Sequence, residues 1–266
     1  MTNKTFRFAA FVAVLVCFTL SLSAGLVIIQ EGGEPGKDKM KFTMYVEGGK
    51  IRVETTMANG TKTASIFDGD RQVMWVLQPE QHTYMEMNAA SMDAMGQRMQ
   101  AAMANLTPEQ KAMMEKAMAG RGGVGGAPAA PKTITFQPKG GTDHVGKFTC
   151  TLYTELTNGQ RSAELCAASM DQIPFSAADL KAFKALAKFG ESMSKMGGRG
   201  SGFTPPSVEE LHGYPVHSVR YDGTRATYEM TVLSADQKSV DSSMFTIPAG
   251  FTKQDMMGGR GGRSPQ

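Results

Sequence analysis

The chain has 266 residues, and its 28 Lys and Arg face 25 Asp and Glu, which gives a net charge of +3. This length is enough for one sizeable hydrophobic core or two small ones. Because the charges are nearly balanced, the sequence lacks the basic surface that nucleic acids or anionic membranes attract, and we expect no nucleic-acid partner.

Residues 1–25 have the pattern of a secretory signal peptide. Two basic residues precede an uncharged run over residues 8–29, which contains the small residues Ser23, Ala24 and Gly25. We predict cleavage after Ala24 or Gly25 and export to the periplasm or the cell exterior. An uncleaved anchor is the alternative, because the run is long enough to span a bilayer. The chain would then contact a membrane through this segment only.

The cysteines fit an exported protein. Cys17 would leave with the signal peptide, and Cys150 and Cys166 would remain in an oxidising compartment. A three-residue loop over residues 157–159, with Gly159 in the left-handed region, would place these two cysteines opposite each other on neighbouring strands. We therefore predict a disulfide between Cys150 and Cys166.

Residues 40–87 have the pattern of an antiparallel meander of short strands. Tight-turn pairs, such as the one at residues 59–60, separate segments rich in β-branched and aromatic residues. Within residues 50–56, apolar side chains alternate with Arg52 and Glu54, which predicts one buried face and one solvent-exposed face. The expected strands cover residues 40–46, 50–56, 61–67, 72–77 and 82–87.

A helical pattern follows from Ala89. Thr107 and Gln110 have the spacing of a capping box, with a proline between them at the first helical position. We predict a Met-rich helical insertion over residues 89–119 and a flexible Gly-rich linker over residues 120–131.

Methionine is unusually frequent in this chain, with 21 residues. Met92, Met95, Met99 and Met103 fall on one face of the predicted insertion helix. The plainest interpretation is an adaptable apolar face that packs on the sheet or on a partner. Two alternatives stay open: a flexible surface for hydrophobic ligands, and a Cu(I) site built from thioether sulfurs.

The rest of the chain continues as strands around one further helix. Ser176 is expected to cap a helix that carries Leu180, Phe183, Leu186 and Phe189 on its apolar face. The expected strands cover residues 133–137, 147–156, 160–167, 216–221 and 227–233, with a closing segment at residues 245–251. A Gly/Pro loop is expected at residues 197–206, and a disordered Gly/Arg-rich tail at residues 253–266.

The segments Tyr45–Glu54, Ile66–Gly69, Met74–Tyr84 and Ser243–Phe251 resemble an exported bacterial domain-of-unknown-function family, the 4412 type. That family is related to the periplasmic lipoprotein carriers. The resemblance implies an α+β fold in one domain over residues 26–252: a curved antiparallel sheet, or half-barrel, whose concave side is covered by helices, here with Gly-rich flexible loops. In the carriers, such a fold encloses an apolar cavity for acyl chains. The resemblance names no catalytic residue.

Sequence motifs for catalysis or metal binding are not found. The chain contains no nucleophile elbow, phosphate loop or zinc-protease helix motif. The four histidines, His82, His144, His212 and His217, are scattered without the spacing of a zinc site. We therefore expect a non-enzymatic protein without a cofactor.

These patterns favour an exported protein of the cell envelope that binds a hydrophobic ligand, such as a lipid or acyl chain, or an envelope protein. The alternatives are a Met-rich Cu(I)-binding periplasmic protein and a structural or interaction protein of the envelope. We expect hydrophobic ligands between the sheet and its helices, since known ligand sites are mostly apolar. The candidate contact residues are Trp75, Tyr84, Met95, Met99, Phe183 and Leu186.

Overall fold

The computed structural model describes residues 24–104, 133–195 and 210–254, together with residues 106, 107, 109, 110, 113 and 208. Most of the predicted signal peptide, the second part of the helical insertion, the Gly-rich linker, the Gly/Pro loop and most of the tail lie outside the described residues. The sequence-based expectations for those segments stay predictions.

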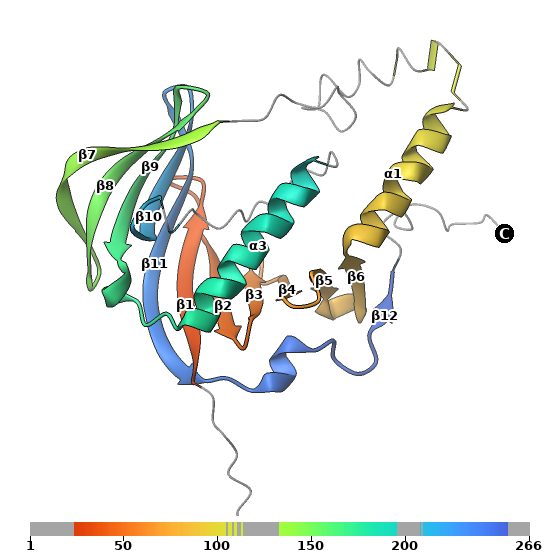
Figure 1. The fold of residues 1–266 in the computed structure, drawn as a ribbon, viewed down its shortest axis with the longest axis horizontal. Helices are drawn as coiled ribbons and strands as arrows, with labels where there is room; N and C mark the ends of the chain where they lie inside the picture. Colours follow the sequence, from red (N-terminus) through yellow and green to blue (C-terminus); the bar gives the residue numbers. More distant parts are fainter. Residues whose placement is uncertain are drawn as a thin grey trace, which may run out of the picture.

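Within the described residues, twelve strands form one large, open, curled sheet (Figure 1). Neighbouring strands are antiparallel, except that β12 runs parallel to β6 at one edge. Across the sheet the order is β12-β6-β5-β4-β3-β2-β1-β11-β10-β9-β8-β7. The strands are β1 (Ala24–Gly33), β2 (Met40–Glu47), β3 (Lys50–Thr56), β4 (Lys62–Asp68), β5 (Val73–Gln78), β6 (Thr83–Met87), β7 (Ile134–Val145), β8 (Phe148–Thr157), β9 (Gln160–Ser169), β10 (Gly213–Asp222), β11 (Arg225–Ser239) and β12 (Thr252–Lys253).

Strand β1 lies in the middle of the sheet, between β2 and β11, and was not among the strands predicted from the sequence. Its first residues were assigned to the uncharged N-terminal run. Both faces of β1 are buried, with Leu26 and Ile28 on one side and Val27 on the other. A strand buried on both faces forms a continuous apolar segment, which periodicity cannot separate from the hydrophobic region of a signal peptide.

The predicted meander over residues 40–87 is confirmed, with strand ends within one or two residues of expectation. The turn between β2 and β3 has Gly48 and Gly49 at φ +56° and +81°. Two successive positive φ values are what a tight hairpin turn of the favoured hand requires, and glycine adopts them without a Cβ clash.

Strand β7 is longer than the five residues predicted from residue 133, because it continues through a bulge. The pairing of β7 with β8 shifts between Pro138 and Thr142. Gly140 and Gly141 adopt positive φ values of +73° and +86° there. These glycines look like a turn in the sequence, but they form a β-bulge within the strand.

The predicted disulfide is present: the Cys150 and Cys166 sulfurs are bonded at 2.02 Å, with the two Cα atoms 5.3 Å apart. The predicted register was wrong, however. The β8–β9 turn has two residues, since Thr157 pairs with Gln160, and a bulge follows. Cys150 is therefore opposite Ala168, and the disulfide joins diagonal rather than directly opposed positions.

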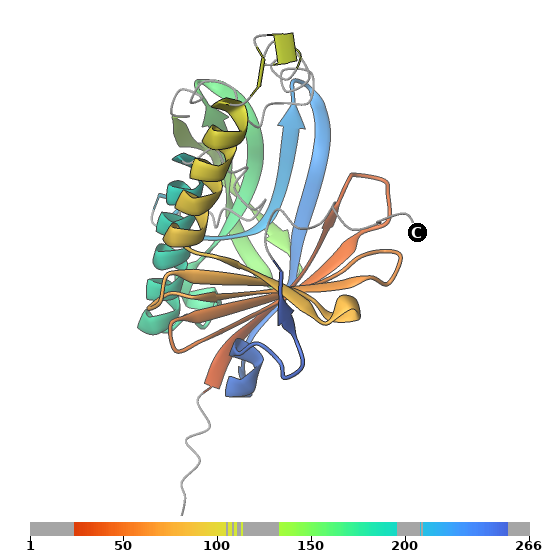
Figure 2. The ribbon, with the colours of Figure 1, turned by 90° about the vertical axis from the view of Figure 1, so that its right-hand side faces the viewer.

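Two helices lie on the same side of the sheet, α1 (Ala89–Ala104) and α3 (Ala177–Lys195) (Figures 1 and 2). Ser176 begins α3 with a capping box, in which the Ser176 and Asp179 side chains each accept a hydrogen bond from the other residue's backbone N–H. Thr107 and Gln110 exchange the same pair of bonds, as predicted. Helix α3 contacts β2 and β3.

A C-terminal strap, residues 240–253, crosses the other side of the sheet from the end of β11 to β12 (Figure 1). It includes the short 3-10 helix η3 (Ser242–Phe245). Arg52 donates to the Met244 carbonyl over 2.9 Å, and the Thr252 N–H donates to the His82 carbonyl over 2.9 Å. The face that carries Arg52 was predicted to be exposed to solvent, but the strap covers part of it.

The sheet therefore has a separate hydrophobic core on each face. The α3-side core consists of Leu26, Ile28, Met44, Val46, Ile51, Phe67, Met74, Met92, Phe148, Cys150, Cys166, Ala168, Ile173, Ala182, Phe183, Leu186, Phe189, Tyr214, Val216, Val232 and Ala235. The strap-side core consists of Val27, Ala64, Ile66, Val73, Trp75, Leu77, Val240 and Phe245, with Ile29, Tyr45, Tyr84, Met244, Ile247 and Phe251 packed against it.

Candidate functional site

The α3-side core is an apolar layer between α3 and the sheet. Ala182, Phe183, Leu186 and Phe189 recur at helical spacing, so α3 presents one apolar face to the strands. The strands contribute side chains from β1 to β5 and from β8 to β11, at alternate positions except where a bulge interrupts β11. The layer therefore extends over most of the sheet, and α3 contacts it as far as Phe67 on β4 and Tyr214 on β10.

Two groups of aromatic rings pack α3 against its surroundings, one around Phe183 and one around Phe189. Near its N-terminus, the Phe175 ring centroid lies 5.5 Å from that of Phe183 and 5.5 Å from that of Tyr214. Further along the helix, the Phe189 and Phe67 ring centroids are 5.4 Å apart. Such tilted and edge-on pairs stabilise packing beyond the burial of area alone.

One polar pair lies within this apolar layer. The Gln30 side-chain amide donates a hydrogen bond to the Tyr214 hydroxyl over 3.3 Å, and the two residues are only 2% and 3% exposed. Burial raises the pKa of Tyr214 well above its ordinary value. The phenol therefore stays protonated under physiological conditions and can donate as well as accept a hydrogen bond.

The sequence-predicted contact residues are divided between the two cores. Phe183 and Leu186 belong to the α3-side core, whereas Trp75 and Tyr84 lie on the strap side of the sheet. Neighbouring residues of a strand point to opposite faces, and in β5 it is Met74, not Trp75, that faces α3. The side chains of Met95 and Met99 lie outside the described parts of the chain.

Sequence reasoning missed Gln30, Phe175 and Tyr214. Gln30 was hidden because β1 was assigned to the N-terminal apolar run. Tyr214 lies just before the strand that was predicted to begin at residue 216, whereas β10 begins at Gly213. A polar glutamine within an otherwise apolar strand was the signal that could have identified the pair.

Of the four methionines on one face of the predicted insertion helix, Met92, Met95, Met99 and Met103, the structure describes the side chain of Met92. Met92 is buried in the α3-side core, which fits its interpretation as a packing residue. The side chain of Met103, like those of Met95 and Met99, lies outside the described residues. In the part of the chain that the structure describes, no group of three or more His, Cys, Asp and Glu side chains could hold a metal ion.

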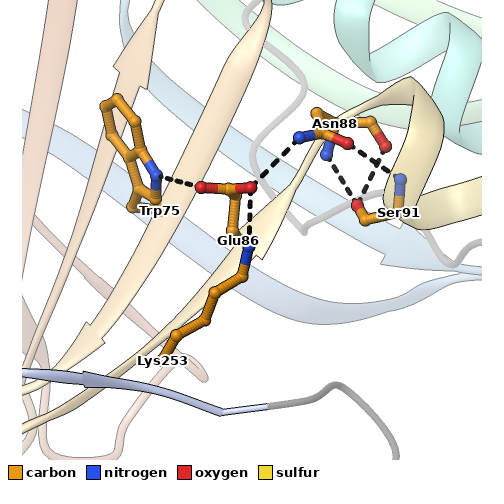
Figure 3. A network of polar contacts seen from close by, with 5 residues as sticks. All are labelled: Trp75, Glu86, Asn88, Ser91 and Lys253. Carbon is orange, nitrogen blue, oxygen red and sulfur yellow. Dashed lines mark hydrogen bonds and ion pairs between the residues drawn. The ribbon is translucent and has the colours of Figure 1, made fainter.

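Trp75 instead takes part in a polar network at the β6 edge (Figure 3). Its indole N–H donates to Glu86 Oε2 over 3.0 Å, while Lys253 and the Asn88 amide donate to Glu86 Oε1 over 2.8 and 3.2 Å. Hydrogen bonds from Lys253 and Trp75 hold the pKa of Glu86 below its ordinary value. Because Asn88 also exchanges hydrogen bonds with Ser91, the network joins the strap, the sheet and the start of α1.

None of the helices within the described ranges combines the length and the hydropathy that crossing a membrane requires.

Comparison with known proteins identifies one family and several distant structures. The family model described as Domain of unknown function (DUF4412) matches residues 91–251, and no curated protein matches the chain. Two structures of PNGF-II, in space groups C2 and P21, are 9% and 8% identical, with TM-scores of 0.39 and 0.36 over 88% and 87% of this chain. The chain spans only 31% of the length of each.

A third similar structure is the LolA superfamily protein NE2245 from Nitrosomonas europaea. It is 8% identical, with a TM-score of 0.29, over 85% of this chain and 91% of the other. At such TM-scores, none of the three structures supports a conclusion about fold or function.

Proposed function

The chain belongs to the family described as Domain of unknown function (DUF4412), and for this member we propose a non-enzymatic role in the cell envelope, the binding of a hydrophobic ligand between α3 and the sheet. The observation that carries the proposal is the α3-side core, an apolar layer that continues across the sheet beneath α3. Known small-molecule sites are mostly apolar with a few polar groups, which fits this layer and its Gln30–Tyr214 pair.

The layer is lined by side chains that can rearrange. Met44, Met74 and Met92 are buried members of the α3-side core. Unbranched thioether side chains fill irregular spaces and repack around ligands of different shape at low cost in free energy. The composition of the layer therefore favours a ligand class over one rigid molecule.

Binding requires α3 to move outward, because the buried members of the layer already pack together. The capping box between Ser176 and Asp179 is internal to the helix and would move with it. Lys181 and Asp70 form an ion pair at 3.5 Å between well-exposed side chains, which contributes little to the free energy of docking. Outward movement of α3 would disrupt the apolar contacts of Phe183, Leu186 and Phe189, which a hydrophobic ligand would replace.

Strand β1 supports export with cleavage of the N-terminal segment. The residues from Ala24 onward belong to a strand in the middle of the sheet. A membrane anchor would then have to be formed by residues 8–23, fewer than the about 20 that span a bilayer. This supports cleavage near Ala24 or Gly25 over an uncleaved anchor.

The test is a titration of the mature protein with N-phenyl-1-naphthylamine, an uncharged apolar fluorophore. We expect saturable binding at micromolar probe. Leu186→Glu places a charge on the buried face of α3 and should abolish binding. Lys188→Glu changes the exposed face of the same helix and should leave the affinity within about twofold, because its side chain is exposed to solvent.

Far-UV circular dichroism checks that both variants fold. Mass spectrometry of lipid retained by protein purified from its own envelope gives a second readout that needs no variant. Absence of saturable binding together with absence of retained lipid would contradict the proposal and favour a structural or interaction protein. Equal binding by folded Leu186→Glu and Lys188→Glu would place the ligand elsewhere.

A further inference from the structure

The Gln30–Tyr214 pair is a buried, hydrogen-bonded polar pair within the apolar α3-side core. Gln30 lies on β1 and Tyr214 on β10, so a hydrogen bond between residues far apart in the sequence connects the two sides of β11. The rings of Phe175 and Phe183 lie beside Tyr214, with centroids 5.5 and 6.2 Å from its own. A ligand inserted between α3 and the sheet would meet this pair next to the helix N-terminus.

The pair has hydrogen-bonding capacity beyond its own bond. The Tyr214 hydroxyl accepts from Gln30, so its own proton can still be donated. The Gln30 amide carries a second N–H and a carbonyl oxygen. An incoming hydroxyl or ester group could therefore accept from Tyr214 and, in the case of a hydroxyl, also donate.

The charges around the pair disfavour an ionised head group. Among the described residues, the buried ionisable carboxylates are Asp68 and Asp179, and no Lys or Arg is buried. Asp179 stands one helical turn before Phe183, on the same side of α3. A carboxylate next to Tyr214 would thus lose its water without gaining a buried cation as a partner.

We propose that Gln30 and Tyr214 recognise the head group of the bound amphiphile and select an uncharged one, an alcohol or an ester, over an ionised carboxylate. This inference rests on the proposed function, since it concerns the same layer between α3 and the sheet. It names the substrate class as neutral lipids with a hydrogen-bonding head.

The test is displacement of N-phenyl-1-naphthylamine by three ligands of matched chain length at about pH 8, where a carboxylic acid is ionised. The ligands are 1-decanol, 1-bromodecane and decanoate. We expect decanol to displace the probe at lower concentration than decanoate. In Tyr214→Phe, which keeps the ring and removes the hydroxyl, we expect the affinity for decanol to fall about fivefold to tenfold and that for bromodecane to stay within about twofold.

Tyr45→Phe is the matched control, because it removes a hydroxyl from the strap-side core on the other face of the sheet. Tyr45→Phe should leave the affinities for decanol and for bromodecane unchanged. Equal losses of decanol and bromodecane affinity in Tyr214→Phe would overturn the inference, since the residue would then act by packing alone. Decanoate binding as tightly as decanol would also overturn it. Failure of the probe itself to bind would instead contradict the proposed function, and the inference would fall with it.

Discussion

Glu86 shows how single side chains join separate parts of this fold. One carboxylate accepts hydrogen bonds from Trp75 on β5, Lys253 on the strap and Asn88 at the start of α1 (Figure 3). Arg71 adds a positive charge 5.2 Å from the Trp75 ring centroid. The sequence suggested Trp75 as a ligand contact. In the structure its indole N–H instead donates to Glu86 and helps to stabilise the edge of the sheet formed by β6 and β12.

We predict that Glu86 stabilises the fold in a pH-dependent way. Hydrogen bonds from Lys253 and Trp75 lower its pKa in the folded state. Its contribution is therefore present above the unfolded pKa of about 4.3 and is lost as pH falls through the lower folded value. Glu86→Gln should lower the free energy of unfolding by about 1 kcal/mol at neutral pH, with the difference from wild type shrinking at acid pH.

Urea denaturation at a series of pH values between about pH 7 and about pH 3 measures how this difference changes as pH falls. Glu34→Gln is the control: its carboxylate pairs with Lys37 and its pKa is also lowered, but both side chains are exposed, and we expect no measurable change. If the difference in free energy of unfolding between wild type and Glu86→Gln grew as pH falls, the predicted direction of the pH dependence would be wrong.

At the residue level, the sequence predicted which two cysteines form the disulfide, but not the register of the strands that carry them. The Cys150–Cys166 disulfide followed from the export signal and from the two hairpin strands. Its diagonal placement did not, because a bulge near Glu155 changes which residues oppose each other. Side-chain direction along a strand likewise depends on register, so Trp75 was expected on the side that Met74 occupies.

The C-terminal strap gives the closing segment of the chain, residues 245–251, a place in the packing of the sheet. Phe245 is buried in the strap-side core, and the Phe251 ring centroid lies 5.6 Å from that of His82. His82 adopts a left-handed φ of +50°, and its carbonyl accepts from Thr252. The residues that resemble the family's closing segment therefore have a structural role here, to fasten the chain end across the sheet.

We predict that Phe245→Ala detaches the strap and destabilises the protein. Phe245 is 4% exposed, and removal of a buried phenylalanine ring typically costs about 3 to 5 kcal/mol. Trp75, the single tryptophan of the chain, should become more exposed in the folded variant, with a red shift of its emission. Denaturant unfolding and tryptophan emission are the measurements.

Met57→Ala provides the control, since Met57 is 40% exposed and should change stability by less than about 0.5 kcal/mol. If Phe245→Ala had the stability and emission of the wild type, the strap would not be packed on the sheet as described.

Elements with a clear turn chemistry were predictable, and those that depend on long-range pairing were not. The hairpins over residues 40–87 follow from glycine turns and alternating side chains. Strand β1 could not be identified, because its burial results from β2 and β11, one of which lies some two hundred residues away. The full length of β7 was not predicted, because a Gly-Gly pair such as Gly140 and Gly141 is typical of a turn, whereas here it forms a bulge within the strand.

At the scale of the whole molecule, one sheet separates two cores with different covers. The strap is held by hydrogen bonds to β6 and by Arg52, so its removal would break backbone pairing as well as apolar contacts. Helix α3 covers its core with a continuous apolar face. This asymmetry is why we assign ligand binding to the α3 side and a structural role to the strap side.

Photo-crosslinking tests this assignment most directly. The mature protein would be irradiated with a long-chain alcohol that carries a diazirine on its chain, with and without excess unlabelled alcohol, and the adducts mapped by mass spectrometry. The account predicts competed adducts on α3, around Phe183 and Leu186, and on facing strand residues such as Met44. Competed adducts on Trp75 or Tyr84, or no competed adduct at all, would contradict it.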